Sequence, residues 1–210
     1  MIKVMIADDH TIVRDGLKQI LAEEEGIQVI GEADNGHDIL RMALSQEVDV
    51  VVLDISMPGK DGLRVLKELQ EEKPSLPVLI LTMHSEDQYA IRVMRAGAAG
   101  YLTKKSAAGE LTAAIRKVAN GQKYMTPSLA SKLVSTMEKS PDDAPHEDLS
   151  DREYQVLCLI AVGKKLKDIG EELCLSPKTV STYQARIIEK LNVDSTADLI
   201  RYAMEKGLVN

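Results

Sequence analysis

The sequence contains few cysteines, no long apolar run and no leader-like beginning. Its two cysteines, Cys158 and Cys174, both fall within apolar helical patterns, so we predict two buried, reduced thiols and no disulfide framework. A membrane helix needs roughly 20 consecutive apolar residues, and the longest apolar run here ends at Asp54. Acidic residues follow the first strand-like run too soon for a signal peptide. We therefore expect a cytoplasmic globular protein that does not enter a membrane.

The chain also lacks an overall positive charge. The formal net charge is −7; residues 1–149 carry 17 Lys and Arg against 24 Asp and Glu, whereas residues 150–210 carry 9 of each. A chain of 210 residues is long enough for one or two domains, and the charge asymmetry favours two. Binding to nucleic acid would have to depend on a local basic patch, because the chain has no general basic field.

Short apolar runs alternate with segments of helical period in the first 120 residues. This alternation predicts an α/β fold in which helices cover both faces of a parallel sheet. The third run, VVVL, shows no polar alternation, as expected for a strand that is buried on both faces. The five predicted strands are 2–7, 27–31, 49–53, 78–81 and 100–102.

The pattern changes after residue 121. Thr126-Pro127 predicts a helix start, since proline is favoured at the first helical position, and SPDDAPHED is typical of an exposed linker. Four short helices are predicted after it, with a capping-box pattern at Ser150, caps at Ser176 and Ser195, and a tight turn before the third helix. We therefore predict a sheet domain over 1–121, a linker with one helix over 122–149, and a helix-turn-helix domain over 150–210.

Three carboxylates follow predicted strands. Asp8 and Asp9 come after the first strand, and Asp54 comes after the third. If the strand order is 2-1-3-4-5, these strands are neighbours at the edge where such sheets bind ligands. Converging carboxylates repel one another and need a cation, and oxygen ligands favour Mg²⁺ over Zn²⁺. The alternative for Asp9 is that it caps a helix that begins near Thr11.

Two further polar residues follow the fourth and fifth strands, namely Thr82 and Lys104. A hydroxyl, an ammonium and a divalent cation around one carboxylate form a site for a phosphoryl group attached to that carboxylate. Asp54 would be the nucleophile that forms the acyl phosphate. Considered alone, Thr82 could be a residue of high β-propensity and Lys104 a solvated loop lysine.

The segments ADDH, LDISMPGKDG, LTMHS and GYLTKK resemble the receiver domain of bacterial two-component response regulators. The resemblance implies a doubly wound, flavodoxin-like sheet of five parallel strands in the order 2-1-3-4-5. It implies that Asp54 accepts phosphate from a sensor histidine kinase. It further implies that Asp9, Asp54 and the Ser56 carbonyl bind Mg²⁺, that Asp8 assists through water, and that Ser56 and His84 occupy positions that tune the phosphate lifetime.

The same resemblance implies a switch. Thr82 and Lys104 would contact the phosphoryl group, and Tyr101 would match an aromatic residue that rotates inward on activation. Receiver domains often carry proline after the lysine, where this chain has Lys105. That departure weakens an expectation of a cis-proline and leaves the role of the lysine unchanged.

The last sixty residues resemble the LuxR-type helix-turn-helix, and the whole chain resembles the NarL/FixJ response-regulator family. The matching segments are LSDREYQVL, the glycine of AVGKKLKDIGEEL, and LSPKTVSTYQARIIEKL. The resemblance places helix 176–191 in the DNA major groove, where Lys178 and Thr179 contact phosphates. The residues expected at base edges or beside them are Ser181, Thr182, Gln184, Ala185 and Arg186.

A basic patch is expected around this helix, although a lysine cluster alone is more often a solvated surface. Tyr183 stands where the family commonly has His, and Gly170 where Ala is common. The DNA sequence recognised by better-known members therefore cannot be transferred to this chain. The patch comprises Lys164, Lys165 and Lys167 before the second helix and Lys178, Arg186 and Lys190 on the third.

These features predict a phosphorylation-dependent transcription regulator that is not an enzyme. By resemblance, phosphorylation releases the recognition helix and the protein forms a homodimer on promoter DNA. Leu199, Ile200 and Ala203 of the fourth helix are either the dimer contact or ordinary core residues. Two alternatives are a phosphatase of the haloacid-dehalogenase type, which needs a carboxylate where Ser56 stands, and a protein–protein adaptor that never contacts DNA.

Overall fold

The computed structural model describes residues 1–57, 60–83, 86–137 and 145–209. The chain divides into two compact units, Met1–Ala130 and Ser131–Asn210, and each is described by itself. Among the described residues, none of the helices combines the length and the apolar character needed to cross a bilayer.

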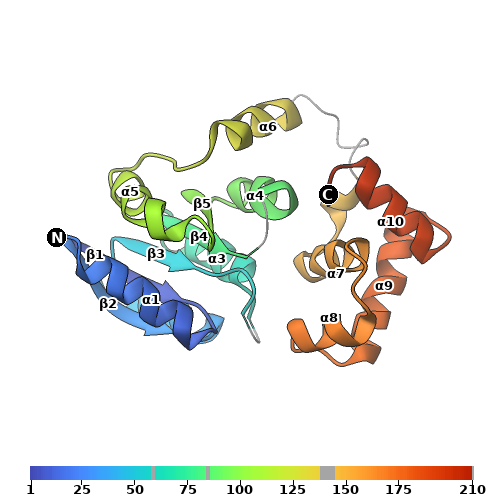
Figure 1. Cartoon of the computed structure of the whole chain (residues 1–210), viewed down its shortest axis with the longest axis horizontal. Coiled ribbons are helices and arrows are strands. Elements are labelled where there is room, and N and C mark those ends of the chain that lie inside the picture. The colour runs from blue at the N-terminus through green and yellow to red at the C-terminus, as the bar shows by residue number, and fades with distance from the viewer. Residues whose placement is uncertain (58–59, 84–85, 138–144, 210) are drawn as a thin grey trace. The chain divides into compact units, whose positions relative to one another are not determined.

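The first unit contains a five-stranded parallel sheet in the order β2-β1-β3-β4-β5, as predicted (Figure 1). Every residue of VVVL in β3 is buried, which matches its unbroken apolar character. In the register, Ala7 of β1 is paired with Leu53 of β3. The strands are β1 (Ile2–Ala7), β2 (Ile27–Ala33), β3 (Val50–Leu53), β4 (Val78–Thr82) and β5 (Gly100–Thr103).

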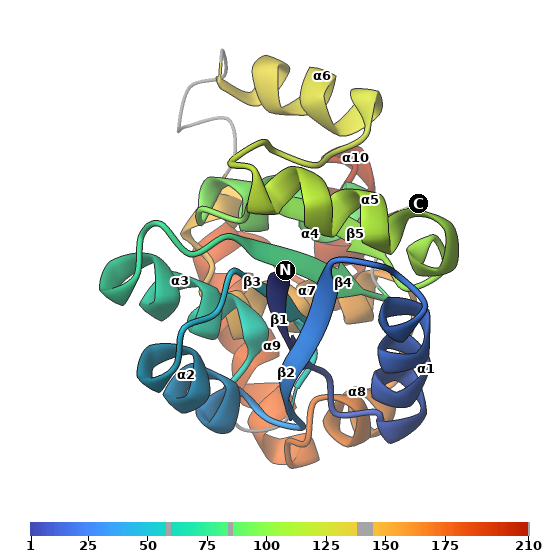
Figure 2. The ribbon, with the colours of Figure 1, turned by 90° about the vertical axis from the view of Figure 1, so that its left-hand side faces the viewer.

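Four helices connect the strands, a fifth follows β5, and together they cover both faces of the sheet. Val4 and Ile6 of β1 pack with buried residues of α1 and α5, so these two helices cover one face. Figure 2 shows α2 and α3 on the other side of the sheet from α1. The helices are α1 (Thr11–Ala22), α2 (Gly36–Ser45), α3 (Gly62–Glu72), α4 (Glu86–Arg95) and α5 (Ala107–Ala119).

The segment after α5 covers the outer edge of β5. The Tyr101 amide donates to the Tyr124 carbonyl at 3.1 Å, and the Tyr124 amide donates to the Ala99 carbonyl at 2.9 Å. These bonds satisfy backbone groups that an edge strand would otherwise expose. Helix α6 (Pro127–Met137) then begins at the predicted proline, with the Leu129 amide donating to Thr126 Oγ1 at 3.2 Å.

The second unit consists of short helices with the predicted caps. The Ser150 and Glu153 side chains form a complete capping box at the start of the first one. The side chains of Ser176 and Ser195 accept hydrogen bonds from the Thr179 and Asp198 amides. The helices are α7 (Asp151–Ala161), α8 (Leu166–Glu172), α9 (Pro177–Leu191) and α10 (Thr196–Glu205).

The end of the predicted linker is structured and belongs to this unit. Pro145–Asp148 forms a 3₁₀ turn, η2, that contacts α9. His146 Nδ1 lies 2.8 Å from the Tyr202 hydroxyl, and Leu149 is buried. A single turn with one apolar neighbour has no periodicity from which it could be recognised. Residues 138–144, in the middle of the predicted linker, lie outside the described residues.

The prediction of two buried thiols is wrong for Cys174. Cys158 is buried, but Cys174 is exposed and lies after α8 in the turn before α9, with φ +54°. The turn is closed by the Leu175 amide, which donates to the Gly170 carbonyl at 2.8 Å. A Cβ at Gly170 would lie 2.6 Å from the Leu175 carbonyl oxygen, so glycine permits this close approach. The apolar sequence pattern that suggested a buried Cys174 thus extends beyond the end of α8.

Candidate functional site

The predicted carboxylates converge at one edge of the sheet because β1 and β3 are adjacent. The Asp54 amide donates to the Ala7 carbonyl at 2.9 Å, which places Asp54 beside the residues that follow β1. One ligand atom from each of Asp8, Asp9, His10 and Asp54 lies within 4.8 Å of the others. Asp8 and Asp54 are almost fully buried, with exposed fractions of 1% and 2%.

Lys104 supplies positive charge between the two buried carboxylates. Its Nζ lies 2.6 Å from Asp8 Oδ2 and 2.6 Å from Asp54 Oδ2. The Lys104 amide donates to the Thr82 carbonyl at 2.8 Å, which fixes the chain where it leaves β5. The alternative of a solvated loop lysine is therefore wrong, since the Lys104 side chain is only 8% exposed.

Burial and neighbouring charges shift the pKa values of Asp54 and Lys104. Desolvation raises the pKa of the Asp54 carboxyl, although Lys104 and the Ser56 amide oppose the rise. Burial alone would lower the pKa of the Lys104 ammonium, but Asp54 and Asp8 outweigh it and raise the pKa above the ordinary value. Strongly perturbed ionisable groups in contact are typical of functional sites.

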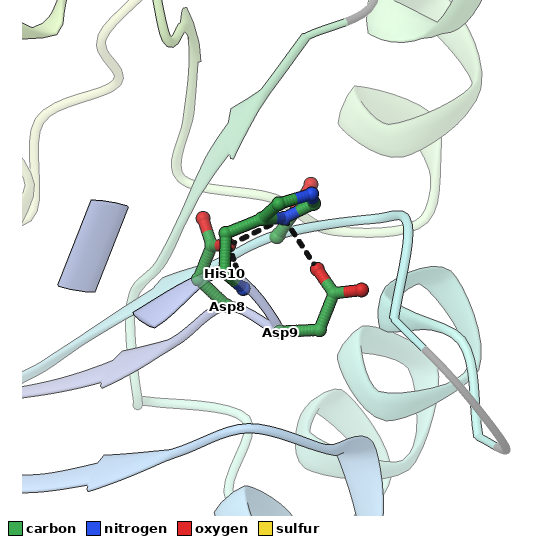
Figure 3. Close-up of side chains that lie close together, drawn as sticks. Asp8, Asp9 and His10 are labelled. Atoms are coloured by element: carbon green, nitrogen blue, oxygen red, sulfur yellow. Dashed lines mark hydrogen bonds and ion pairs between the residues drawn. The ribbon is translucent and has the colours of Figure 1, made fainter. Parts of the chain in front are cut away.

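His10 joins the two carboxylates that follow β1 (Figure 3). Its amide donates to Asp8 Oδ1 at 2.9 Å, and its Nδ1 lies 2.7 Å from Asp9 Oδ1. His10 is the N-cap residue of α1 and makes no side-chain cap bond. The alternative that Asp9 caps this helix is therefore wrong. His10 was not predicted as part of the cluster, although it directly follows Asp9.

Arg14 is a second residue that the sequence did not single out. Its Nη1 donates to the main-chain carbonyl of Asp8 at 2.7 Å, and its side chain is largely buried. The only sequence signal was its place one turn into the helix after the acidic pair. A contact with a backbone carbonyl leaves no mark in the pattern of residue types.

Described residues that follow β3 lie close to Asp54 on both sides of the gap at 58–59. The Ser56 amide donates to Asp54 Oδ1 at 3.2 Å, and the Asp61 side chain caps α3 through the Arg64 amide. A Cβ at Gly62 would lie 2.0 Å from the Asp54 carbonyl oxygen, so any larger residue would displace the backbone that carries Asp54. This close approach gives a physical role to the glycine of KDG.

Thr82 and Tyr101 lie on the neighbouring strands β4 and β5. Thr82 ends β4 and is paired with Thr103, and Tyr101 of β5 is paired with Ile80. Both side chains are buried, with exposed fractions of 0% and 1%. His84, to which the resemblance assigned a tuning role, lies outside the described residues.

This arrangement can bind a hard cation and hold a reactive carboxylate. The carboxylate oxygens of Asp8, Asp9 and Asp54 are the ligand type that Mg²⁺ prefers. Buried carboxylates close to one another require positive charge, which a divalent ion or an ammonium provides. The donor set therefore fits Mg²⁺.

Helix α9 has one buried face and one exposed face, and most of its predicted DNA contacts lie on the exposed face. Val180, Ile187 and Leu191 are buried against the rest of the unit. Ser176 Oγ accepts from the Thr179 amide at 3.1 Å, so the first turn is held in place. The predicted contact residues that are exposed on this helix are Lys178, Ser181, Thr182, Ala185, Arg186 and Lys190.

Several predicted DNA contacts also form bonds within the unit. Lys190 Nζ lies 2.7 Å from Glu153 Oε2, and Gln184 Nε2 donates to Thr196 Oγ1 at 2.8 Å. Lys164 forms an ion pair with Glu172, and Lys167 Nζ lies 3.8 Å from Glu171 Oε1. Lys165 is exposed and caps α8 without a side-chain bond.

Both units of the chain are similar to known protein families. Residues 4–116 match the response regulator receiver domain family, and residues 147–203 match the LuxR family of bacterial regulatory proteins. The response regulator GacA of Pseudomonas aeruginosa is 43% identical over 211 residues, which cover 100% of this chain and 99% of GacA.

Solved structures of similar proteins extend over both units. A structure of the RcsB response regulator of Salmonella typhimurium has a TM-score of 0.63 and 28% identity, and the match covers 97% of this chain and 100% of that one. RcsB of Salmonella enterica serovar Typhimurium, bound to promoter rprA in the presence of phosphomimetic BeF₃⁻, gives a TM-score of 0.62 and 27% identity over 96% of this chain and 98% of that one. The chain therefore belongs to the NarL/FixJ family of two-component response regulators, with a receiver domain followed by a LuxR-type DNA-binding domain.

Proposed function

We propose that this response regulator binds promoter DNA when Asp54 is phosphorylated by a sensor histidine kinase in the cytoplasm. The observation that carries this proposal is the position of Asp54, which is buried within the acidic cluster and bonded to both Lys104 and the Ser56 amide. The output is a change in DNA binding and transcription, so we do not assign the chain an enzymatic role.

Mg²⁺ fits this site through Asp9, Asp54 and the Ser56 carbonyl, with Asp8 acting through water. When bound, the ion neutralises charge on the transferring phosphoryl group. The role of Asp8 is consistent with its geometry, because its two carboxylate oxygens already contact the His10 amide and Lys104.

Asp54, Lys104 and Thr82 have different roles in phosphoryl transfer. A carboxylate oxygen of Asp54 attacks phosphorus, an O–P bond forms, and the P–N bond to the kinase histidine breaks with its electron pair returning to the imidazole nitrogen. Lys104 stabilises negative charge on the phosphoryl oxygens, and the Thr82 hydroxyl donates to one of them. Tyr101 responds on the neighbouring strand, so that phosphorylation biases a two-state element.

Helix α9 is the proposed DNA-reading element. The Ser176 cap fixes its first turn, and Lys178 and Thr179 lie in that turn, where they would approach a phosphate. RcsB, which is similar along the whole chain, is bound to promoter DNA in one of its structures. Leu199 and Ala203 of α10 are fully buried within the unit, so they are core residues and not the dimer contact. We propose that this chain binds as a homodimer and that base edges face Ser181, Thr182, Gln184, Ala185 and Arg186.

Phosphorylation by a small donor tests the proposal without a known kinase. Full-length protein is incubated with phosphoramidate and Mg²⁺, and the added mass is measured in the intact chain. We expect about one phosphate per chain, as a single nucleophilic carboxylate requires, and none in Asp54→Asn. Asp61→Asn is the matched control, because Asp61 is also a buried aspartate and asparagine caps a helix equally well. Equal uptake by wild type and Asp54→Asn would reject the assignment.

DNA binding is tested with the same protein preparations. Genomic fragments are selected on wild type treated with phosphoramidate and on Asp54→Asn treated in the same way. The proposal predicts sequence-specific enrichment with the phosphorylated wild type only. Identical enrichment by both proteins would show that DNA binding does not depend on Asp54.

A further inference from the structure

The peptide between Asp8 and Asp9 lies outside the helices and strands. β1 ends at Ala7 and α1 begins at Thr11, so these residues have no regular ladder to fix them. The Asp8 amide is held by the Ala33 carbonyl at 3.1 Å. The Asp8 carbonyl is held by Arg14 Nη1 at 2.7 Å. The Arg14 bond therefore restrains the peptide plane from which the Asp9 side chain departs.

The Arg14 guanidinium also contacts residues of β2 and α1. Its Nε lies 3.5 Å from Glu32 Oε2, and its Nη2 donates to Thr11 Oγ1 at 3.4 Å. Glu32 also forms an ion pair with Lys18, whose Nζ lies 2.9 Å from Glu32 Oε2. The guanidinium group is planar and makes several directed bonds at once, so it joins α1 and β2 to a single backbone oxygen.

We propose that Arg14 is a positioning residue for divalent-cation binding and orients the Asp8–Asp9 peptide so that the Asp9 carboxylate faces Asp54. This inference rests on the proposed function, in which the acidic cluster binds Mg²⁺. Arg14 is not a ligand of the cation. Among the described residues, its side chain contacts the cluster at the main-chain oxygen of Asp8, and its amide donates to the His10 carbonyl at 3.1 Å.

The direction in which Mg²⁺ affinity changes distinguishes a positioning role of Arg14 from an effect of its charge. A guanidinium close to a cation site repels the incoming ion, so removal of its charge alone would tighten Mg²⁺ binding. Loss of the hydrogen bond frees the peptide and weakens Mg²⁺ binding. Partners that orient metal ligands typically change affinity by about 10- to 100-fold. The two roles therefore predict changes in opposite directions for the same substitution.

The experiment is a titration with MgCl₂ followed by the amide resonances of uniformly ¹⁵N-labelled full-length protein. We expect Arg14→Gln to weaken Mg²⁺ binding by about 10-fold. Arg14→Lys keeps the charge and one donor, so its affinity should fall between those of wild type and Arg14→Gln. The matched control is Lys18→Gln, which removes the same charge from the same helix and the same Glu32 partner without a contact to Asp8.

A second control removes the anchor of Arg14. Glu32→Gln loses the ion pairs to Arg14 and Lys18 but leaves the bond to the Asp8 carbonyl, so Mg²⁺ affinity should stay within about threefold of wild type. Folding of each variant is checked by its amide spectrum. If Arg14→Gln does not fold, Arg14→Lys decides: affinity equal to wild type overturns the positioning role, and weaker binding supports it.

The outcomes distinguish this inference from the proposed function. If Arg14→Gln binds Mg²⁺ as tightly as wild type or more tightly, the positioning role is overturned and the proposed function stands. If Lys18→Gln weakens binding as much as Arg14→Gln, the effect is one of charge or helix stability and the inference is again overturned. If wild type itself shows no Mg²⁺-dependent shifts at Asp9, Asp54 or Ser56, the proposed function fails first.

Discussion

Lys190 Nζ lies 2.7 Å from Glu153 Oε2, and this bond joins α9 to the start of α7 across 37 positions of the chain. Glu153 is 3% exposed, and its Oε2 also accepts the Ser150 amide at 2.7 Å. One carboxylate therefore completes a helix cap and neutralises a lysine of the proposed DNA-binding helix. Lys190 consequently has a structural partner that Lys178 lacks among the interactions recorded for the described residues.

The first prediction compares these two lysines in DNA binding. Each phosphate contact contributes about 0.9 to the slope of log affinity against log salt concentration. Lys178→Gln should reduce that slope by about one, because Lys178 is exposed in the first turn of α9. Lys190→Gln should leave the slope nearly unchanged. Fluorescence anisotropy with a selected promoter fragment at several salt concentrations measures both, and a slope reduced only by Lys190→Gln would reverse the assignment.

The second prediction concerns acid stability of the DNA-binding domain. Burial acts to raise the pKa of Glu153, but Lys190 and the Ser150 bonds outweigh it and lower the pKa below the ordinary value of 4.5. A carboxyl with a lowered pKa in the folded state stabilises the fold above its unfolded pKa. This stability is lost as pH falls through the folded pKa. Glu153→Gln should therefore be less stable than wild type near neutral pH and should lose less on acidification.

Hydrogen exchange of α7 and α9 amides in the full chain, measured between pH 7 and pH 4, checks this expectation. Glutamine retains a capping-box side chain, so the variant isolates the charge of Glu153 from its capping role. We expect a loss of about 1–2 kcal/mol near neutral pH, as for a hydrogen bond to a charged group. A pH dependence identical to that of wild type would show that Glu153 does not carry the linkage.

The third prediction concerns the Lys104 bridge. Lys104→Met would leave Asp8 and Asp54 buried without their shared cation, which should destabilise the receiver domain by roughly 3 kcal/mol. Added Mg²⁺ should stabilise this variant more than it stabilises wild type, because the ion then replaces the missing charge. Urea unfolding with and without MgCl₂ measures both effects. Lys105→Met is the control, since Lys105 is exposed and adjacent; equal stability of the two variants would exclude the buried bridge as a stabilising feature.

The sequence alone predicted the sheet and the position of Asp54, and the reasons are physical. VVVL has no polar alternation, which only a strand buried on both faces tolerates, and the residue after it must then emerge at the ligand-binding edge. The caps at Ser150, Ser176 and Ser195 were recognised because a short polar side chain before an apolar run satisfies free amides. The acidic cluster followed from the strand order 2-1-3-4-5, which the resemblance to receiver domains implied.

Contacts that depend on packing could not be predicted in this way. Arg14 bonds to a backbone carbonyl, which carries no residue-type signal, and Lys190 reaches Glu153 only through the packing of two helices. The sequence of α9 alone gave no sign of this bond, because α7 supplies the partner of Lys190. The turn at His146 was missed because its burial against Tyr202 depends on tertiary contact.

The fourth prediction tests the cover on the edge of β5. A Cβ at Gly100 would lie 2.8 Å from the Tyr124 carbonyl oxygen and 2.9 Å from Leu79 Cδ1. Gly100→Ala should therefore displace the Tyr124 segment, break its bond to the Tyr101 amide and speed hydrogen exchange there. Gly16→Ala is the control, because a Cβ at this helical glycine meets nothing within 4 Å. It should stabilise α1 by about 0.5–1 kcal/mol, and protection of the Tyr101 amide in Gly100→Ala equal to that in wild type would rule out the clash.

The last prediction concerns the turn before the recognition helix. Cys174 and Asn192 are the described residues other than glycine with positive φ, at +54° and +50°. Asparagine adopts this left-handed conformation more readily than a residue with an ordinary side chain. Cys174→Asn should therefore raise the free energy of unfolding of the DNA-binding domain by roughly 0.5 kcal/mol, whereas Cys174→Ala keeps the Cβ strain and should change it little. Urea unfolding under reducing conditions compares the two, and a gain shared equally by both variants would assign the effect to removal of the exposed thiol rather than to backbone strain.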